Sequence, residues 1–302
     1  MVSRVRRRRR LQRCRLAESD SVGTVLGQRV ITALLLLAVL LPALWASSLW
    51  PFALLTLLMV GAAGWEWGRL NGLVGASAVT LGLAVAALSA TVHLLVGDHG
   101  VPAVLWWLAL ASWVLGGAWV LGQGVAGWPR IPAGLRVSLG VLMLVAAWLA
   151  MAQAKTVGVN FLLSIFVLVW AADVAAYFCG RAFGRRKLAP SISPGKSWEG
   201  VAGGMAGVLV LAVLWVSLDQ RVVASVPSLY SLLLERLGVI GLVVSALFLA
   251  GLSVVGDLFE SLVKRSAGVK DSSALLPGHG GVLDRIDALL PVFPLALALA
   301  SL

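Results

Sequence analysis

A polar segment near the end of the chain, residues 261–287, carries side chains that could bind and transfer phosphate groups. We call it the island, because apolar sequence long enough to cross a membrane lies on both sides of it. Basic side chains bind phosphate oxygens, and glycines let the backbone approach a ligand closely. Its composition predicts chemistry on a charged substrate at a bilayer surface. The candidate residues are Asp257 just before it, and Lys264, Arg265, Lys270, Asp271, His279, Gly280, Gly281, Asp284, Arg285 and Asp287.

A second polar segment, residues 181–199, contains Ser193-Pro-Gly-Lys196-Ser197-Trp-Glu199. A turn that presents hydroxyls, N–H groups and an ammonium at the start of a helix suits phosphate oxygens. It is not a Walker A loop, because the upstream glycine and the preceding strand are missing. Other basic residues of this segment also fit ordinary positive anchors at a membrane surface.

Carboxylates accompany these basic residues and would repel a phosphate on their own. Asp173 lies inside an apolar stretch, where an acid is costly and usually faces a cavity or a partner. Asp284 and Asp287 are three residues apart, which puts both on one face at the start of a helix. Because Mg²⁺ binds one or two carboxylates together with substrate phosphates, the pattern predicts magnesium-dependent phosphoryl or nucleotidyl chemistry.

Structural interpretations of the same residues stay open. Asp173 could pair with a neighbouring arginine, and Asp284 and Asp287 could cap a helix. Glu260 could sit at a solvated helix end. A lone histidine such as His279 is more often structural than catalytic, and no second histidine nearby suggests zinc.

The elements that position these residues are apolar helices. The chain is 60% hydrophobic and 12% charged, whereas globular domains carry about 25% charged residues. We therefore expect an all-α, polytopic integral membrane protein of about nine transmembrane helices, two of them short for a span of ~20 residues. The apolar segments are 30–49, 51–65, 72–96, 102–122, 135–154, 157–180, 200–218, 237–256 and 286–302.

The distribution of charge predicts the orientation. The net charge of +11 is concentrated in an arginine-rich tail, which suits anionic lipid and topology better than nucleic acid. With the N-terminus in the cytoplasm, all but three of the 24 Lys and Arg residues lie on the cytoplasmic side; the three are Lys155, Arg221 and Arg236. We expect residues 1–27 to be a disordered cytoplasmic tail, 28–156 to form N-terminal transmembrane helices and 157–302 to form the catalytic region, with both polar segments cytoplasmic.

The island resembles the signature of the phosphatidate cytidylyltransferase (CDP-diacylglycerol synthase) family at every specified position. The matching pattern is Ser261-x-Val263-Lys264-Arg265-x4-Lys270-Asp271-x-Ser273-x2-Leu276-Pro277-x-His279-Gly280-Gly281-Val282-x-Asp284-Arg285-Ile286-Asp287. The Ser193–Gly200 segment is similar to a second family motif, in which Thr is more usual at the Ser197 position. Asp173-x3-Tyr177-x2-Gly180-Arg181 also fits. The resemblance covers the chain from about Leu26 onward.

The resemblance implies that CTP and phosphatidic acid are condensed to CDP-diacylglycerol and pyrophosphate. It implies one or two Mg²⁺ ions held by Asp257 and Asp284, with Asp287 and Asp173 as weaker candidates. Phosphates would be held by basic residues of the island, helped by the second motif. Substrate-binding candidates are Asp173, Ser193, Lys196, Ser197, Glu199, Gly280 and Gly281; the remaining island residues and Asp257 are catalytic candidates.

Two other functions fit some of the same features. A CTP-dependent polyprenol or lipid kinase would release CDP instead of pyrophosphate. A secondary transporter would explain Asp173, but its polar residues would lie at the midplane of related halves. The resemblance also implies that the protein lies in a bacterial plasma (inner) membrane, with the lipid bilayer as its partner. Because members of the family can dimerise, a homodimer is possible.

Overall fold

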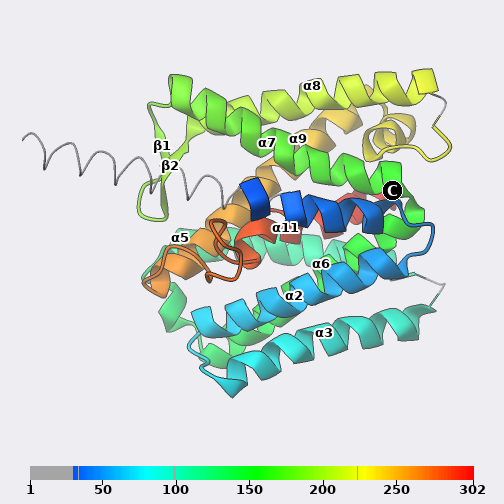
Figure 1. Ribbon diagram of the computed structural model, residues 1–302. Helices are drawn as coiled ribbons and strands as arrows, with labels where there is room; N and C mark the ends of the chain where they lie inside the picture. Colours follow the sequence, from blue (N-terminus) through cyan, green and yellow to red (C-terminus); the bar gives the residue numbers. More distant parts are fainter. Residues whose placement is uncertain (1–29, 33, 98–99, 223) are drawn as a thin grey trace, which may run out of the picture.

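The structure is a computed structural model that describes residues 30–32, 34–97, 100–222 and 224–302. The expected tail, residues 1–27, lies outside the described residues. The described chain is an all-α bundle with one short two-stranded hairpin (Figure 1). Six of its helices are long and apolar enough to cross a membrane, which confirms a polytopic membrane protein. They span Ala76–Val96, Ala103–Gln123, Ala133–Val157, Val159–Phe183, Trp198–Val222 and Leu229–Ser266.

The N-terminal helices are a shorter apolar helix, Val30–Trp45, followed by α2 (Trp50–Leu70) and α3 (Ala76–Val96). Glycines let α2 and α3 pack with their backbones close together, because a Cβ on Gly82 would lie 2.5 Å from the Gly61 carbonyl oxygen. The segment expected at 51–65 continues to Leu70 in the structure. That extension carries Glu66 and Trp67 into the polar end of the bundle.

The next apolar segment is one rod of three pieces: α4 (Ala103–Ala111), the π-helical turn η2 (Ser112–Gly116) and α5 (Gly117–Gln123). A short 3₁₀ turn, η3 (Trp128–Arg130), leads into α6 (Ala133–Val157). At the far end of α6, the buried Lys155 ammonium donates to the carbonyls of Leu44 and Ala46. These bonds tie α6 to the end of the first helix, away from the island.

Helices α7 (Val159–Phe183) and α8 (Trp198–Val222) are joined by the hairpin of β1 (Lys187–Ala189) and β2 (Ser193–Ser197). The strands pair antiparallel, with Lys187 opposite Ser197. Small residues bring α7 and α8 together: a Cβ on Gly203 would overlap Cys179, and one on Gly207 would lie 2.6 Å from the Ala175 Cβ. The second polar segment is therefore held at one end of a tight helix pair.

Helix α9 (Leu229–Ser266) is longer than the apolar segment predicted at 237–256. It contains a kink at Gly238, whose φ of +69° suits glycine and not residues with a Cβ. Its last turns extend beyond the apolar segment and into the island, so that Asp257, Glu260, Lys264 and Arg265 all lie on this helix. Their relative positions are thereby fixed by helical geometry.

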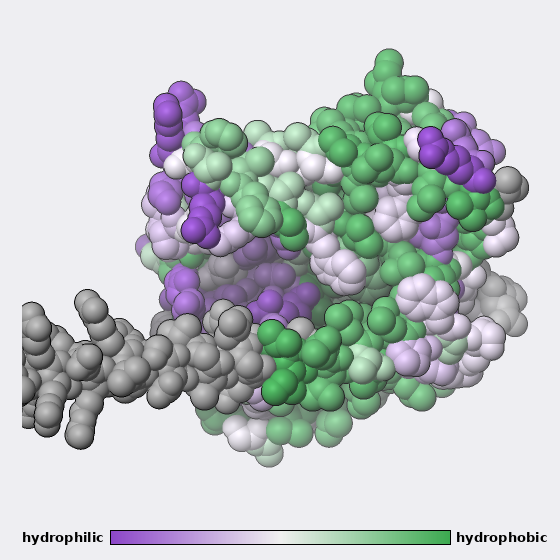
Figure 2. Space-filling model, turned by 45° about the horizontal axis from the view of Figure 1, so that its top comes forward, coloured by the Kyte–Doolittle hydropathy of each residue, from purple (hydrophilic) through white to green (hydrophobic). Residues whose placement is uncertain are grey.

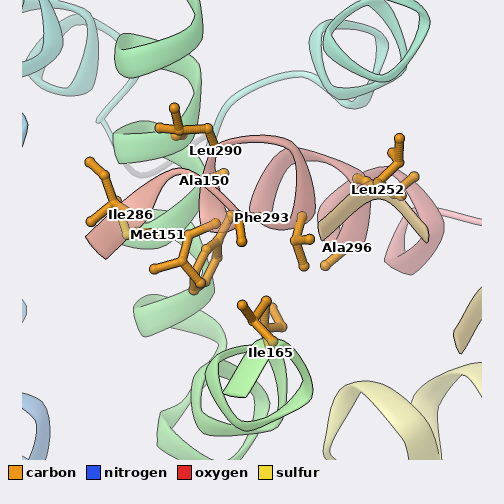
Figure 3. Close-up of a cluster of buried hydrophobic side chains, with 14 of the residues drawn as sticks. Ala150, Met151, Ile165, Leu252, Ile286, Leu290, Phe293 and Ala296 are labelled. Carbon is orange, nitrogen blue, oxygen red and sulfur yellow. The ribbon is translucent and has the colours of Figure 1, made fainter. Parts of the chain in front are cut away.

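Two short helices end the chain: α10 (Leu283–Ile286) and α11 (Leu289–Ala300). Every residue from Leu289 to Leu299 is buried, and Figure 3 shows Phe293 and Ala296 of α11 among side chains of α6, α7 and α9. With 12 residues, α11 measures about 18 Å, less than the ~30 Å of a bilayer core. The segment predicted at 286–302 is therefore enclosed by protein and is shorter than a lipid-exposed span.

Candidate functional site

The two polar segments of the sequence meet in the structure. The Lys196 ammonium, at the end of β2, lies 2.6 Å from the Asp257 carboxylate on α9. The Arg265 side chain, two turns further along α9, donates to the Ile192 carbonyl of the hairpin at 3.3 Å. The hairpin and the end of α9 therefore lie together at one end of the bundle.

The hairpin is held to α8 by two of the predicted binding residues. The Ser197 hydroxyl accepts the Gly200 N–H at 3.2 Å, so Ser197 is the buried cap of α8. The Glu199 carboxylate accepts the N–H groups of Arg185 and Arg186 at 3.1 and 3.2 Å. Both residues shape the loop, which leaves Ser193 and Lys196 as its ligand-facing polar groups.

A cleft of about 450 Å³ lies between α7, α8, α9 and β2. Its walls are mostly small and apolar, whereas charged side chains stand where the hairpin meets the helices. Asp173 faces this cleft, as expected for an acid inside an apolar helix. The charged and hydroxyl residues of the lining are Asp173, Tyr177, Arg181, Ser193, Lys196, Ser197 and Asp257. Figure 2 shows a hollow lined by hydrophilic residues between hydrophobic surfaces at this end of the molecule.

Asp284 organises the island. Its carboxylate accepts the Lys264 ammonium at 2.6 Å, the Gly281 N–H at 2.7 Å, and the N–H and hydroxyl of Ser272 at 3.0 Å each. Burial alone would raise the pKa of Asp284, but the bonds from Lys264 and Gly281 outweigh it and hold that pKa below its ordinary range. With both oxygens engaged, Asp284 is a fixed anion at the start of α10.

Lys264 lies between two carboxylates. Besides Asp284, its ammonium pairs with Glu260, one turn earlier on α9. Only 2% of Glu260 is exposed, so the interpretation of Glu260 as a solvated helix end is wrong. The sequence hid this burial because α9 continues past its apolar segment while the island folds over it.

Glu66 is a site residue that sequence reasoning missed. It comes from α2, is fully buried and has four donors of the island within hydrogen-bond distance. Its Oε1 accepts the Ser273 hydroxyl at 2.5 Å and the Val282 N–H at 2.9 Å. Its Oε2 accepts the Leu283 N–H at 2.6 Å and lies 3.2 Å from the Ser272 hydroxyl, whose single proton is shared with Asp284. An acid at the edge of an apolar segment was the available signal, the same signal that singled out Asp173.

The glycines of the island are required by this arrangement. Gly280 has φ +78°, and a Cβ there would lie 2.6 Å from Asp284 Oδ2. A Cβ on Gly281 would overlap Ser272 Oγ and Glu66 Oε1. Both positions therefore require glycine, because the backbone there packs directly against the carboxylates of Asp284 and Glu66.

A second cavity, of about 640 Å³, opens within the island. The Arg285 guanidinium lines it and donates to the His279 carbonyl at 3.0 Å, which fixes the loop between them. The lining is mainly polar and includes Ser273 and five of the predicted residues: Lys270, Asp271, His279, Gly280 and Arg285. The other predicted residues of the island, Lys264, Arg265, Gly281, Asp284 and Asp287, line neither the cleft nor this cavity.

The carboxylates predicted as metal ligands lie in different surroundings. Burial, and next the negative charge of nearby Asp257, raise the pKa of Asp287 well above its ordinary value. A cation beside Asp257 and Asp287 would relieve that repulsion, so this pair fits a magnesium ion. Asp284 fits less well because Lys264, Ser272 and Gly281 already occupy it. Among the described residues, no group of three His, Cys, Asp or Glu side chains is arranged to hold a metal.

Comparisons with known proteins agree with this geometry. Residues 27–302 match the family model described as the cytidylyltransferase family. The phosphatidate cytidylyltransferase of Pseudomonas aeruginosa is 41% identical over 284 residues, covering 91% of this chain and 97% of that protein. The protein of the same name from Brucella suis is 36% identical over 272 residues, covering 88% and 89%. That from Haemophilus influenzae is 50% identical over 137 residues, or 45% of this chain and 44% of that protein. The polar island and the helix bundle that holds it therefore belong to a member of the cytidylyltransferase family.

Proposed function

We propose that this chain is a CTP:phosphatidate cytidylyltransferase. An oxygen of the terminal phosphate of phosphatidic acid attacks the α-phosphorus of CTP, the bond from that phosphorus to the β-phosphate oxygen breaks, and pyrophosphate leaves with CDP-diacylglycerol as the other product. The observation that carries the proposal is the Lys196–Asp257 pair, which joins the hairpin to α9 just before the island, at the mouth of an apolar-walled cleft. The full-length relatives support the same reaction.

The two cavities suit two different substrates. The cleft beside α7 and α8 has apolar walls and a charged rim, which matches a lipid with a phosphate head. The island cavity is polar and is lined by Lys270 and Arg285, which suits the phosphates of a nucleoside triphosphate. We therefore assign phosphatidic acid to the cleft and CTP to the island cavity.

Position and charge are sufficient catalytic devices for this reaction. The attacking phosphate monoester has a second pKa near 6, by analogy with phosphoserine, and is largely dianionic at neutral pH. A dedicated general base is then unnecessary, and the task is to align two polyanions. Lys196 can hold the lipid phosphate, while Lys264, paired with Glu260 and Asp284, fixes the start of α10 against α9.

Magnesium is part of the proposal. Asp257 and Asp287 would hold the ion, which when bound neutralises phosphate charge and favours pyrophosphate departure. Lys196, whose ammonium lies 2.6 Å from the Asp257 carboxylate, would stand beside that site and hold the lipid phosphate.

We also propose that the site faces the cytoplasm of a bacterial cell, where CTP is made. The positive-inside distribution supports this orientation, because all but three of the Lys and Arg residues that the structure describes belong to the polar end. A homodimer stays a prediction from the family resemblance, to be checked by the mass of the purified protein in detergent.

The decisive experiment is an assay of purified protein with CTP and phosphatidic acid during a magnesium titration. Pyrophosphate and CDP-diacylglycerol in equal amounts, dependent on the metal, are expected. Release of CDP with a phosphorylated lipid would identify a lipid kinase instead. Substrate flux in proteoliposomes without CTP turnover would identify a transporter.

A further inference from the structure

Glu66 connects the N-terminal helices to the island, although about 200 residues separate them in sequence. It is the α2 side chain whose two oxygens meet donors on both flanks of the Gly280-Gly281 turn. Ser272 and Ser273 precede that turn, and the N–H groups of Val282 and Leu283 follow it. The Glu66 carboxylate therefore ties together the two flanks of this turn.

The chemistry of the four donors requires a carboxylate. An ionised carboxylate only accepts hydrogen bonds, and its two oxygens offer about four acceptor positions. Glutamine would replace one oxygen by an NH₂ group, which would face the N–H of Val282 or Leu283. A serine hydroxyl can rotate to accept, but a backbone N–H cannot, so one buried donor would stay unsatisfied.

The Glu66 contacts reach the charged centre through Ser272. The Ser272 hydroxyl lies 3.2 Å from Glu66 Oε2 and 3.0 Å from Asp284 Oδ2, and its own N–H donates to Asp284. Asp284 in turn pairs with Lys264 of α9. Movement of the segment around Ser272 would thus displace Asp284 and the ammonium that it holds.

From this geometry we infer that Glu66 is a positioning residue for cytidylyl transfer. It does not line either described cavity; it acts by fixing the island, and through it Asp284 and Lys264, relative to the cleft. This inference rests on the proposed function, because the reaction used to test it is the transfer of a cytidylyl group from CTP to phosphatidic acid. It predicts a loss of turnover without a loss of lipid binding, because the cleft is built from α7, α8, α9 and the hairpin.

The test compares Glu66→Gln with Asp219→Asn in the full-length protein. Asp219 is a matched control: its carboxylate also accepts several bonds, from Asn160, Ser228 and Ser231, but at the opposite end of the bundle. We expect Glu66→Gln to lower kcat about 10²-fold, the loss typical of small misplacements in an active site. The KM for phosphatidic acid should stay unchanged. Asp219→Asn should leave kcat and the KM for phosphatidic acid unchanged, even if it lowers Tm as much as Glu66→Gln does.

Limited trypsin digestion supplies a readout that does not depend on the reaction. Lys270 lies exposed in the island, and Glu66→Gln should speed cleavage after it, whereas Asp219→Asn should not. If Glu66→Gln does not yield folded protein, Ser272→Ala combined with Ser273→Ala removes two of the four donors and should lower kcat to a smaller extent.

Unchanged turnover in Glu66→Gln or in the double alanine variant would overturn the inference. So would losses in Glu66→Gln and Asp219→Asn that simply follow their losses of Tm, or a rise in the KM for phosphatidic acid alone. If the wild-type protein showed no CTP-dependent turnover, the proposed function would fail. Trypsin cleavage would then still decide whether Glu66 holds the island.

Discussion

Lys196 and Lys264 both pair with carboxylates, but their surroundings make them different probes of the site. Lys264 is nearly buried between Glu260 and Asp284. Removing it would leave two carboxylates unpaired in the interior, at a cost of about 3–5 kcal/mol, so a loss of activity would be mixed with unfolding. Lys196 and Asp257 are each about a quarter or more exposed, and their pair contributes about 1 kcal/mol or less. Lys196 therefore reports on chemistry with little effect on stability.

Lys196→Met should lower kcat/KM for phosphatidic acid about 10²-fold, the typical loss when a group that stabilises developing charge is removed. Its Tm should change little. Lys187→Met is the control, since Lys187 lies exposed on β1 of the same hairpin and faces neither cavity. Equal losses in the two variants would mean that the hairpin attracts anions only through its overall charge.

Asp284→Asn should destabilise the protein by about 1–3 kcal/mol at neutral pH, because an amide NH₂ would replace an acceptor of buried donors. The pKa of Asp284 is lowered in the folded protein. Its stabilising contribution is therefore complete above the ordinary carboxyl pKa near 3.9 and is lost as pH falls through the lower folded value. The Tm difference between wild type and variant should shrink below about pH 4. A constant difference down to the most acidic condition would contradict this assignment.

Among the elements, α7 and α8 form the wall of the lipid cleft through a row of small residues. Gly203 and Gly207 let the α8 backbone approach Cys179 and Ala175 of α7. The same approach brings Gly200 and Gly204 into the cleft lining. The width of the cleft is therefore set by helix packing as well as by the side chains at its rim.

Gly203→Ala should separate α7 from α8 and cost about 1–3 kcal/mol, since its Cβ would overlap Cys179. Activity with long-chain phosphatidic acid should fall with it. Gly134→Ala is the control, because a Cβ at Gly134 meets nothing within 4 Å. Alanine there should leave Tm unchanged or raise it slightly, as helical Gly→Ala changes do. Thermal unfolding in detergent measures both, and an undiminished Tm in Gly203→Ala would show that the helix pair is looser than described.

The sequence predicted helices better than it predicted their surroundings. Apolar run length located the long helices, because burying backbone groups in a bilayer demands continuous apolar helix. It could not distinguish α11, since a helix enclosed by protein is as apolar as one enclosed by lipid; only its shortness favoured a core helix. Nor could it find Glu66, whose partners are brought to it by the fold of the whole chain. Asp173 and Asp257 were found because charge in or beside apolar sequence is costly unless it has a use, and Lys196 because it lies in a turn at the start of a helix, which suits phosphate oxygens.

At the scale of the whole molecule, the two polar segments of the candidate site lie at one end of the bundle. The hairpin, the island and the Glu66 end of α2 lie there (Figure 1). Lys155 and Arg221, in the last turns of α6 and α8, and Arg236, near the start of α9, lie toward the other end. The orientation of the protein in the membrane can therefore be measured by labelling one residue at each end of the bundle.

Lys187→Cys and Gln220→Cys, each in a background with Cys14 and Cys179 replaced by serine, should label from opposite sides of the membrane. Lys187 and Gln220 are both exposed, at the hairpin and at the far end of α8. In intact spheroplasts, a membrane-impermeant maleimide should modify Gln220→Cys only, and permeabilisation should expose Lys187→Cys. The reverse pattern would place the active site outside the cytoplasm.

The burial of α11 has a consequence for how the protein is made. Its residues leave the ribosome after all the helices that surround them, so α6, α7 and α9 enter the membrane before their common packing partner exists. Packing of α11 into the centre of the bundle is therefore a step that follows membrane insertion of the helices around it.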